Sequence, residues 1–382
     1  MSVYVWGFGK LGQLGNGQTE ISHTPVEVKL RESCREVQCG GHYTAVVTDS
    51  GALYTFGCGK YGRLGTGDET DRRTPVRVRI TKNGNEVAIH SVSCGNWHGA
   101  AISNEGELYT WGFNRSHGVL GSADVPHLSK PSLLPGPFTM KVAGVSCGNN
   151  FTLLWTTDGV PYSWGCGRHG VLGHGDELPR TNPTLICQFE ADVSRVSFMS
   201  AGFSHCAAVT DKGVYTFGRG QGGALGHGQG HLETTCVPSL VKTLHRECKI
   251  VEVSCSVGEK HGHTLFLDAD GHVLSCGDGY KGKLGFGDQI SRFTATQIPQ
   301  QHFSNEKIRH VAAGGIHSAA VSFVGHIFTW GCGSDGRLGH TDGKGHRYLF
   351  RSDTPRLVEA LSERGVATAI CSSYYHVATL IS

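Results

Sequence analysis

The sequence has no long apolar run and no marked excess of either charge. No stretch approaches the roughly eighteen apolar residues from which a membrane-spanning helix is read, so no membrane span is expected. The chain begins at Met1 without the charged and apolar regions of a secretory signal peptide. Lys and Arg number 34 against 32 Asp and Glu, and the two signs are interspersed. This balance argues against a basic nucleic-acid-binding stripe, so direct contact with nucleic acid is not expected.

A disulfide framework is also not indicated, although the chain has 14 cysteines. Many of them recur at equivalent repeat positions, where a cysteine acts as a small hydrophobic residue. Five occupy strand ends and three lie inside G-C-G; these are Cys39, Cys94, Cys147, Cys255 and Cys371, then Cys58, Cys166 and Cys332. We therefore expect free thiols in a reducing compartment, which predicts a cytoplasmic location, a nuclear one, or both.

Glycine, by contrast, is abundant, and half of its 56 residues lie in seven phrases built on G-x-G-x-x-G-x-L-G. The phrases follow one another at intervals of 50 to 59 residues and begin at Trp6, Phe56, Trp111, Trp164, Phe217, Cys276 and Trp330. A period of this length that fills the chain predicts a propeller or a solenoid. We interpret residues 1–382 as a single propeller domain.

The second repeat shows how one unit is built. Strands are predicted at Val37–Cys39, Thr44–Thr48, Ala52–Phe56 and Thr74–Val78, because these short runs are rich in apolar and β-branched residues. The tight turn Asp49–Gly51 joins the second strand to the third, and the proline of the fourth suits an outer edge. Four antiparallel strands in each of seven units predict an all-β, seven-bladed β-propeller.

The two ends of the chain each hold half of one unit. Residues 369–382 supply a first and a second strand, and the segments Val3–Trp6 and Pro25–Val28 supply a third and a fourth. The sequence therefore predicts a last blade made of residues 366–382 and 1–29, which closes the ring and removes an open edge. This closure favours a complete, monomeric chain, with one domain of a longer protein as the alternative.

The glycine phrases also match the dinucleotide-binding fingerprint, which requires a helix directly after it. Here a polar loop and a proline-bearing strand follow, so we assign the glycines to the scaffold, where they permit positive φ and close packing. The aromatic residues that precede the phrases are expected to pack between blades. No Ser/His/Asp or Cys/His arrangement indicates catalysis, and no cofactor is predicted.

Histidine recurs immediately before the second strand of five units, as His98, His205, His263, His317 and His376. Tyr43 and Phe151 occupy this position in the other two units. One histidine per blade around a wide ring cannot converge on one ion with bonds near 2 Å, so no metal site is predicted. We expect each histidine to form a hydrogen bond that fixes its own tight turn.

The joint pattern of C-G-x-x-H-T, D-G-x-L-Y-x-W-G and G-x-L-G-x-G resembles the repeats of the regulator of chromosome condensation family, across all seven units. The resemblance implies a seven-bladed propeller but leaves the function open. The family's namesake is a nucleotide exchange factor for the small GTPase Ran that docks on chromatin. Relatives serve as substrate modules of ligases, ciliary adaptors, kinase-regulating domains and a plant ultraviolet sensor.

Several of these functions match the sequence only in part. The exchange factor's carboxylates in two loops correspond to amides here, Asn96 and Asn150. The loop at 113–117, which corresponds to its projecting wedge, is one residue longer than its siblings, so a small protrusion is possible. The family's basic N-terminal tail is absent. Of the tryptophans that the ultraviolet sensor needs in these loops, only Trp97 is present.

The loops between first and second strands must emerge on the same face as the glycine phrases. Loops that depart from a regular repeat are where specificity is usually built, and three lie here, at 115–117, at 258–262 and at 341–352. Trp97 is either a binding anchor or is partly buried under a neighbouring loop. The candidate partner-binding residues are Tyr43, Asn96, Trp97, Arg115, His117, Asn150, Phe203, Lys260, His261, Arg347, Arg351, Tyr374 and Tyr375.

These observations favour a non-catalytic scaffold that presents this loop-rich face to a partner protein. The alternative is a guanine-nucleotide exchange factor for a Ran-like small GTPase, which needs no catalytic acid of its own. A chromatin-associated adaptor is a lesser alternative, because a near-neutral charge does not suit binding that depends on phosphate contacts.

Overall fold

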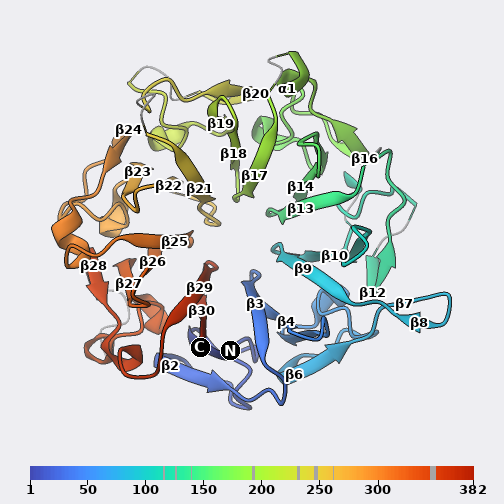
Figure 1. The fold of residues 1–382 in the computed structure, drawn as a ribbon, viewed down its shortest axis with the longest axis horizontal. Helices are drawn as coiled ribbons and strands as arrows, with labels where there is room; N and C mark the ends of the chain where they lie inside the picture. Colours follow the sequence, from blue (N-terminus) through green and yellow to red (C-terminus); the bar gives the residue numbers. More distant parts are fainter. Residues whose placement is uncertain are drawn as a thin grey trace.

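Seven four-stranded antiparallel sheets form the blades of a ring in the computed structural model (Figure 1). The structure describes residues 1–114, 117–124, 127–138, 140–191, 194–229, 233–244, 248–260, 262–344 and 350–382. The first strand of each blade lies nearest the central axis and the fourth lies at the rim (Figure 1). The predicted all-β, seven-bladed fold is confirmed.

Each blade is a meander of four strands, and six of them use consecutive segments of the chain. Their strands are β3 (Cys34–Cys39), β4 (Tyr43–Thr48), β5 (Leu53–Gly57) and β6 (Arg72–Val78); β9 (Ile89–Cys94), β10 (His98–Ser103), β11 (Leu108–Phe113) and β12 (His127–Leu133); β13 (Val142–Cys147), β14 (Phe151–Thr156), β15 (Pro161–Gly165) and β16 (Arg180–Leu185); β17 (Val196–Ala201), β18 (His205–Thr210), β19 (Gly213–Gly218) and β20 (Thr235–Leu240); β21 (Ile250–Cys255), β22 (His263–Asp268), β23 (Val273–Gly277) and β24 (Arg292–Gln297); and β25 (Ile308–Ala313), β26 (His317–Ser322), β27 (Ile327–Cys332) and β28 (Arg351–Leu357).

Short elements decorate this ring without changing it. A hairpin of β7 (Thr81–Lys82) and β8 (Asn85–Glu86) projects from the connection after β6 (Figure 1). The described helices are α1 (Cys187–Ala191) and the 3-10 turns η1 (Lys60–Gly62), η3 (Arg168–Gly170), η4 (Gln221–Gly223), η5 (Tyr280–Gly282), η6 (Gln300–Phe303), η7 (Ser334–Gly336), η8 (Thr341–Gly343) and η9 (Glu359–Leu361). No helix among the described residues is long and apolar enough to cross a membrane.

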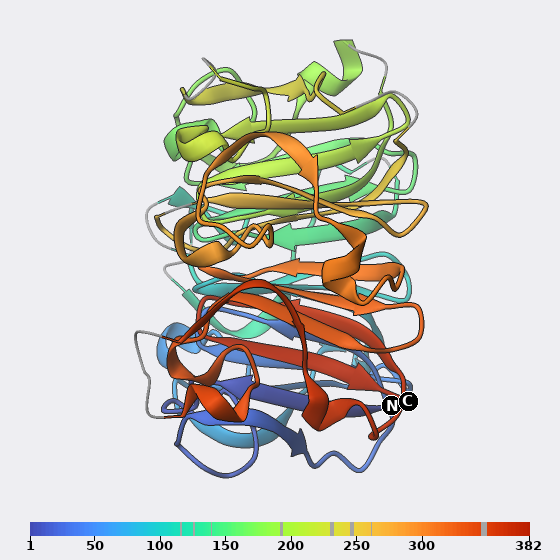
Figure 2. The same cartoon turned by 90° about the vertical axis from the view of Figure 1, so that its left-hand side faces the viewer.

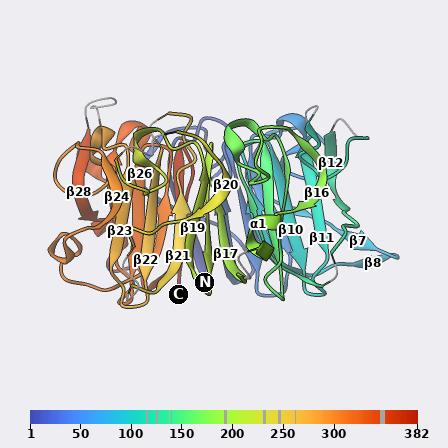
Figure 3. The ribbon, with the colours of Figure 1, turned by 90° about the horizontal axis from the view of Figure 1, so that it is seen from above.

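The seventh blade joins the two ends of the chain. Its strands are β29 (Ala367–Ser372), β30 (His376–Ile381), β1 (Ser2–Gly7) and β2 (Ser22–Val28), in the order β2-β1-β30-β29. The β1–β30 pairing is antiparallel and runs from Ser2 opposite Ile381 to Gly7 opposite His376. The predicted closing blade is therefore confirmed, and both ends of the chain lie at one face of the ring (Figure 3).

The aromatic residues at the ends of the third strands hold neighbouring blades together. Trp6, Trp111, Trp164 and Trp330 are all fully buried. Each indole N–H donates to a carbonyl in the glycine phrase of the preceding blade; Trp111 Nε1, for example, lies 2.9 Å from the oxygen of Arg63. Buried aromatics of this size contribute much of a core's stabilisation, so the expectation that they pack between blades is confirmed.

The phrase glycines bring backbone segments together more closely than a side chain would allow. Gly57 has a φ of +119°, and a Cβ there would lie 2.5 Å from the carbonyl oxygen of His42. At Gly59 a Cβ would lie 2.2 Å from the oxygen of Thr70. Both contacts are with backbone atoms, which cannot move aside as a flexible side chain can. The scaffold interpretation of these glycines is confirmed.

Replacing Gly57 with alanine is expected to lower the free energy of unfolding by about 3 kcal/mol or more, because a strained φ combines with a backbone clash. Gly84 is the matched control, since its φ is +82° and a Cβ there would meet nothing within 4 Å. Gly84→Ala should cost only about 1 kcal/mol. Denaturant unfolding of both variants checks this, and equal losses would contradict the steric argument.

We expected each of the five histidines before the second strands to fix its own turn. The structure shows instead that their main hydrogen bonds cross to the next blade. Each is almost fully buried, and its Nε2 meets a hydroxyl of the following blade at 2.8 to 3.0 Å. The pairs are His98–Thr152, His205–Thr264, His263–Ser318, His317–Ser372 and His376–Thr44. Among the described residues, only His376 also bonds within its turn, through Nδ1 and Ser373 Oγ. We call this set the histidine ring.

The hydroxyl partners determine which nitrogen of the ring histidines carries the proton. Thr264 Oγ1 donates its single proton to the carbonyl of Ala224 at 2.7 Å, so it accepts a hydrogen bond from His205 Nε2. The same arrangement, with Lys283 as the carbonyl, holds for His263 and Ser318. The imidazoles of His205 and His263 are therefore neutral Nε2–H tautomers, and each spans a boundary between blades.

All fourteen cysteines are free. Burial raises the pKa of Cys147 and of Cys255 to about 12, so these thiols stay protonated and are poor nucleophiles. The Sγ atoms of Cys39 and Cys371 lie 3.1 Å apart across the boundary between the β3–β6 blade and the closing blade. The cysteines at the strand ends are thus contacts within and between blades, as expected.

Candidate interaction face

The glycine phrases and the loops between first and second strands emerge together on the face of the ring opposite the chain termini (Figure 2). We call this the glycine-loop face. It carries two groups of half-exposed aromatic side chains, and each group is held by a buried arginine. Neither arginine was singled out from the sequence.

The first group, the Trp97 cluster, joins the β3–β6 blade to the β9–β12 blade. The rings of Tyr61 and Phe113 stack with centroids 4.3 Å apart, and Trp97 lies 5.9 Å from Tyr61. The Arg63 guanidinium lies 4.5 Å from the Trp97 ring and donates to the carbonyl of Asn96 at 3.2 Å. Trp97 is partly buried, so both of its anticipated roles, anchor and packing residue, are compatible with its position.

The second group, the Tyr375 cluster, lies where the closing blade meets its neighbours. Tyr375 stacks on His42 with centroids 4.6 Å apart and contacts Phe8 at 5.5 Å. Tyr374 lies beside Tyr375, and the Arg337 guanidinium approaches both rings. Arg337 Nη1 also donates to the carbonyl of Tyr374 at 2.7 Å. The two clusters therefore share one arrangement. In each, a buried arginine reaches from one blade to the next and lies beneath aromatic side chains.

Burial shapes the charge of these clusters. It lowers the pKa of His42 to about 4, and the nearby Arg63 cation acts in the same direction. His42 is therefore neutral at physiological pH, and it is this neutral ring that stacks on Tyr375. Burial likewise lowers the pKa of Arg63, and the neighbouring Cys58, Tyr43, Asp71 and Tyr61 oppose this effect. The arginines remain charged and present a cation to each aromatic group.

Two hollows open on the same face beside these clusters. The larger, of about 460 Å³, lies between the β13–β16 and β17–β20 blades and is lined in part by His117, Asn150 and Phe203. The smaller, of about 240 Å³, lies between the β17–β20 and β21–β24 blades and includes Lys260. Arg219 lines both hollows. The structure thus brings together four of the predicted contact residues around two adjoining cavities.

The remaining predicted residues are placed less uniformly. Tyr43 is fully buried, and its hydroxyl donates to the carbonyl of His98 at 2.7 Å; its assignment to the surface is wrong, because it fills the inter-blade position of a ring histidine. Asn96 is held by Asn149, whose Oδ1 lies 2.9 Å from Asn96 Nδ2. Arg351 is exposed and paired with Asp353. Arg115, His261 and Arg347 lie outside the described residues.

Acidic side chains on the glycine-loop face are largely engaged within their own loops. Asp68, Asp176 and Asp288 each cap a turn and pair with an arginine four residues later. Several cations of the face differ in having no carboxylate within 4.0 Å among the described residues; they are Lys10, Lys60, Arg168, Arg219 and Lys260. These five cations are therefore not neutralised by a carboxylate within the described part of the chain.

One group of potential metal ligands lies outside this face. Donor atoms of Asp268, Asp270 and His272 lie within 4.8 Å of one another in the turn between β22 and β23. Asp268 Oδ1 accepts the backbone N–H groups of Asp270 and His272, and Oδ2 lies 3.0 Å from His272 Nδ1. Ser103 caps the corresponding turn of the β9–β12 blade in the same way, so these contacts serve the turn.

Comparison with known proteins agrees with this geometry. The model of the RCC1-like domain matches residues 2–378. The chain belongs to the RCC1-like domain family. Among its relatives, the ultraviolet-B receptor UVR8 of Arabidopsis thaliana is 30% identical over 96% of this chain and 79% of the receptor. The human E3 ubiquitin-protein ligase HERC2 is 32% identical over 76% of this chain, but the match spans only 6% of HERC2.

Solved structures support the RCC1-like fold. Human WBSCR16 superposes with a TM-score of 0.85 at 21% identity and covers 100% of this chain and 98% of its own. Prp20p from Saccharomyces cerevisiae gives a TM-score of 0.82 at 21% identity over 99% of this chain and 90% of its own. At these identities the likeness concerns the fold alone.

Proposed function

We propose that this RCC1-like propeller is a non-catalytic scaffold that binds a partner protein with its glycine-loop face. The observation that carries the proposal is the pair of half-exposed aromatic clusters, each held over a buried arginine. Aromatic and arginine side chains are the residue types most enriched among the energetic centres of protein interfaces. Exposed apolar residues at the rim, Leu178 and Ile290, add to the surface that a partner would cover.

Truncating the clusters tests this function. Trp97→Ala and Tyr375→Ala should each reduce capture of specific partners by the intact propeller by about tenfold or more, because each removes a central aromatic contact. The matched control is Phe323→Ala, which removes a 61% exposed aromatic from a turn between second and third strands, on the opposite face. Quantitative mass spectrometry of captured proteins is the measurement. Loss with Phe323→Ala and not with the cluster variants would place the interface on the other face.

A second candidate is nucleotide exchange on a Ran-like small GTPase. Prp20p, whose propeller has the fold described here, has binding properties toward Gsp1p and histones. The amide at Asn96, in place of a carboxylate, counts against this candidate, as does its bond to Asn149. Release of fluorescent GDP from Ran is the direct assay, and no acceleration at micromolar propeller would reject exchange activity.

Chromatin association is a weaker candidate, since the net charge is only +2.

A further inference from the structure

The residue before the leucine of each glycine phrase fills the space between that blade and the next. The seven residues are Gln13, Arg63, Val119, Val171, Ala224, Lys283 and Arg337, and all are at most 2% exposed. In Arg63 and Arg337 the guanidinium extends to a loop carbonyl of the next blade. A long side chain at this position therefore plugs the boundary between blades from within.

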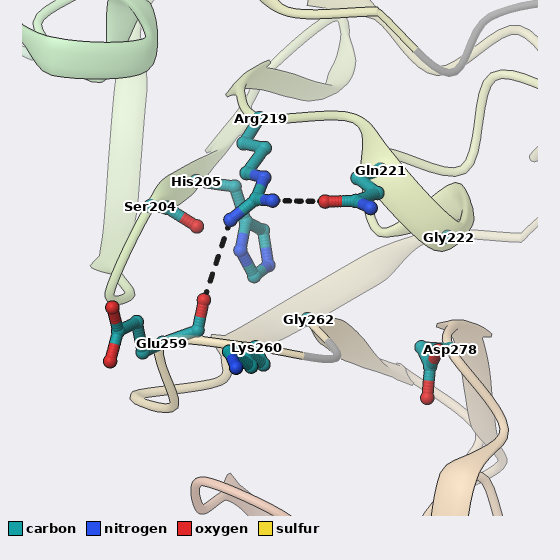
Figure 4. A pocket seen from close by; sticks show the side chains of 9 residues that line it. All are labelled: Ser204, His205, Arg219, Gln221, Gly222, Glu259, Lys260, Gly262 and Asp278. Atoms are coloured by element: carbon teal, nitrogen blue, oxygen red, sulfur yellow. Dashed lines mark hydrogen bonds between the residues drawn. The ribbon is translucent and has the colours of Figure 1, made fainter.

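The boundary after the β17–β20 blade lacks such a plug. Ala224 is the smallest of the seven residues, and Gly222 beside it has no side chain where the β3–β6 blade has Tyr61. The hollow of about 240 Å³ lies there (Figure 4). An engineered apolar cavity of about 150 Å³ holds a benzene molecule, so this volume can accept one protein side chain.

Two side chains that line this pocket have hydrogen-bonding groups or charge that no described residue satisfies. His205 is 1% exposed, and its Nε2–H is committed to Thr264; its Nδ1 has no hydrogen-bond partner among the described residues and lies at the pocket. Arg219 donates to the side chain of Gln221 and, at 3.5 Å, to the backbone oxygen of Glu259 (Figure 4). Neither contact neutralises the guanidinium.

The charge inside the pocket is positive. Arg219 and Lys260 both line it without a carboxylate partner among the described residues. Asp278 contributes little negative charge, because Lys283 Nζ lies 2.7 Å from its Oδ1. The Glu259 carboxylate points away from Gln221 and Asp278, so it lies outside the space between them (Figure 4).

The adjoining hollow extends the pocket into a groove. The hollow of about 460 Å³ shares Ser204, Arg219 and Glu259 with the pocket and adds Arg168 on its far side. Arg168 is exposed and also has no carboxylate within 4.0 Å in the described part of the chain. Three unneutralised cations, Arg168, Arg219 and Lys260, thus follow one groove across three blades.

We infer that this groove binds an acidic segment of a partner protein, with one Asp or Glu side chain of that segment seated in the pocket on Arg219. The carboxylate accepts hydrogen bonds from the guanidinium and from Lys260, and a backbone N–H of the segment can donate to His205 Nδ1. Glu177 and Glu259 also line the groove and would repel an anion placed beside them, so a segment whose carboxylates are spaced apart suits it better than the continuous charge of a nucleic acid. The inference rests on the proposed function and specifies which part of the face, and which partner chemistry, it uses.

Two variants of the intact propeller test the pocket. Arg219→Gln removes the central cation. Ala224→Gln places a longer, uncharged side chain next to Gly262, which lines the pocket, and so narrows the pocket without changing the charge. The control is Arg292→Gln, which removes a cation that already pairs with Asp288 on the same face. Melting curves confirm that each variant is folded.

The probes are a fluorescein-labelled Gly/Ser peptide with spaced aspartates, the same peptide with asparagines, and a single-stranded oligonucleotide of equal charge. Fluorescence anisotropy should show binding of the aspartate peptide alone, weakened about tenfold or more by Arg219→Gln and by Ala224→Gln, and less than about twofold by Arg292→Gln. Equal binding of the two peptides, binding of neither, an unaffected Ala224→Gln variant or tighter binding of the oligonucleotide would each overturn the inference.

The failure of this inference is distinguishable from failure of the proposed function. If Trp97→Ala abolishes partner capture while Arg219→Gln and Ala224→Gln leave it intact, the glycine-loop face binds the partner, and the inference that the groove binds an acidic segment is wrong. If none of the three changes capture, the face itself is wrong.

Discussion

Acidification from about pH 7 to about pH 5 is expected to lower the free energy of unfolding by roughly 8 kcal/mol through the histidine ring and Glu36 alone, which is enough to unfold a typical domain. The cause is the histidine ring. Burial lowers the pKa of His98 and His376 to about 3 and that of His205 to about 4. Burial also holds the pKa of His263 and His317 well below the usual value, with Lys283 and Arg337 acting in the same direction.

The sign follows from proton binding in the two states. Between pH 6.5 and these lowered pKa values the unfolded chain binds a proton at each histidine and the folded chain does not. Stability is therefore fully present above about pH 6.5 and is lost as the pH falls toward about 4. At pH 5 each histidine costs about 2 kcal/mol, or about 10 kcal/mol for five. Burial raises the pKa of Glu36 to about 7, and the stability gained as this carboxyl takes up a proton offsets about 2 kcal/mol of the loss.

The repeat itself supplies a control for this prediction. At the boundary where Phe151 replaces a ring histidine, Cys206 stands at the position of the hydroxyl partner. The double variant His98→Phe/Thr152→Cys copies that pair into the preceding boundary. Denaturant titrations at about pH 7 and about pH 5 should show a loss about 2 kcal/mol smaller than in the parent protein. An identical pH dependence in the two proteins would contradict the role assigned to His98.

Removal of residues 1–28 is expected to abolish folding. The deletion takes away β1 and β2, and with them the buried side chains of Val3, Val5 and Trp6. Burial of each side chain contributes about 1.5 to 3 kcal/mol or more. In addition, β30 loses all of its hydrogen bonds to β1 and becomes an exposed edge strand. The sum is comparable with the net stability of a domain. Circular dichroism and size-exclusion chromatography should show an unfolded or aggregated chain.

A circular permutant separates loss of strands from loss of chain continuity. Ser2 and Ile381 are partners in the β1–β30 ladder, so a short linker can join the two ends. New ends at Gly84, in the exposed β7–β8 hairpin, interrupt no blade. This permutant should melt within a few degrees of the parent protein. A permutant that fails to fold would show that closure depends on more than the pairing of β1 with β30.

The repeating scaffold could be predicted from the sequence, because strand patterns and turn glycines are local signals. Residues 1–29 and residues 369–382 each fit only half a unit, and that mismatch was sufficient to predict the closing blade. The partners of the ring histidines could not be predicted in this way. His98 and Thr152 are 54 residues apart, and only the packing of one blade on the next brings them together.

The candidate site was predictable only in outline. The structure confirms that the glycine phrases and the loops between first and second strands share one face, but Tyr43 proved to be interior and Arg63, Arg219 and Arg337 were overlooked. A side chain at one phrase position can point into the boundary or out to solvent, and spacing does not distinguish the two. A signal was nevertheless available. Arg63, Val171 and Ala224 occupy equivalent positions, and such a change in size predicts a change in how the boundary is filled.

The placement of both chain ends at one end of the β1–β30 ladder has a mechanical consequence. Tension applied to Met1 and Ser382 would load the pair Ser2–Ile381 first and then each following pair in turn. This is an unzipping geometry, in which hydrogen bonds break one after another at low force. Tension applied between Gly7 and Ser382 would instead shear the whole ladder at once. The ring is therefore weakest, under pulling, at the blade that completes it.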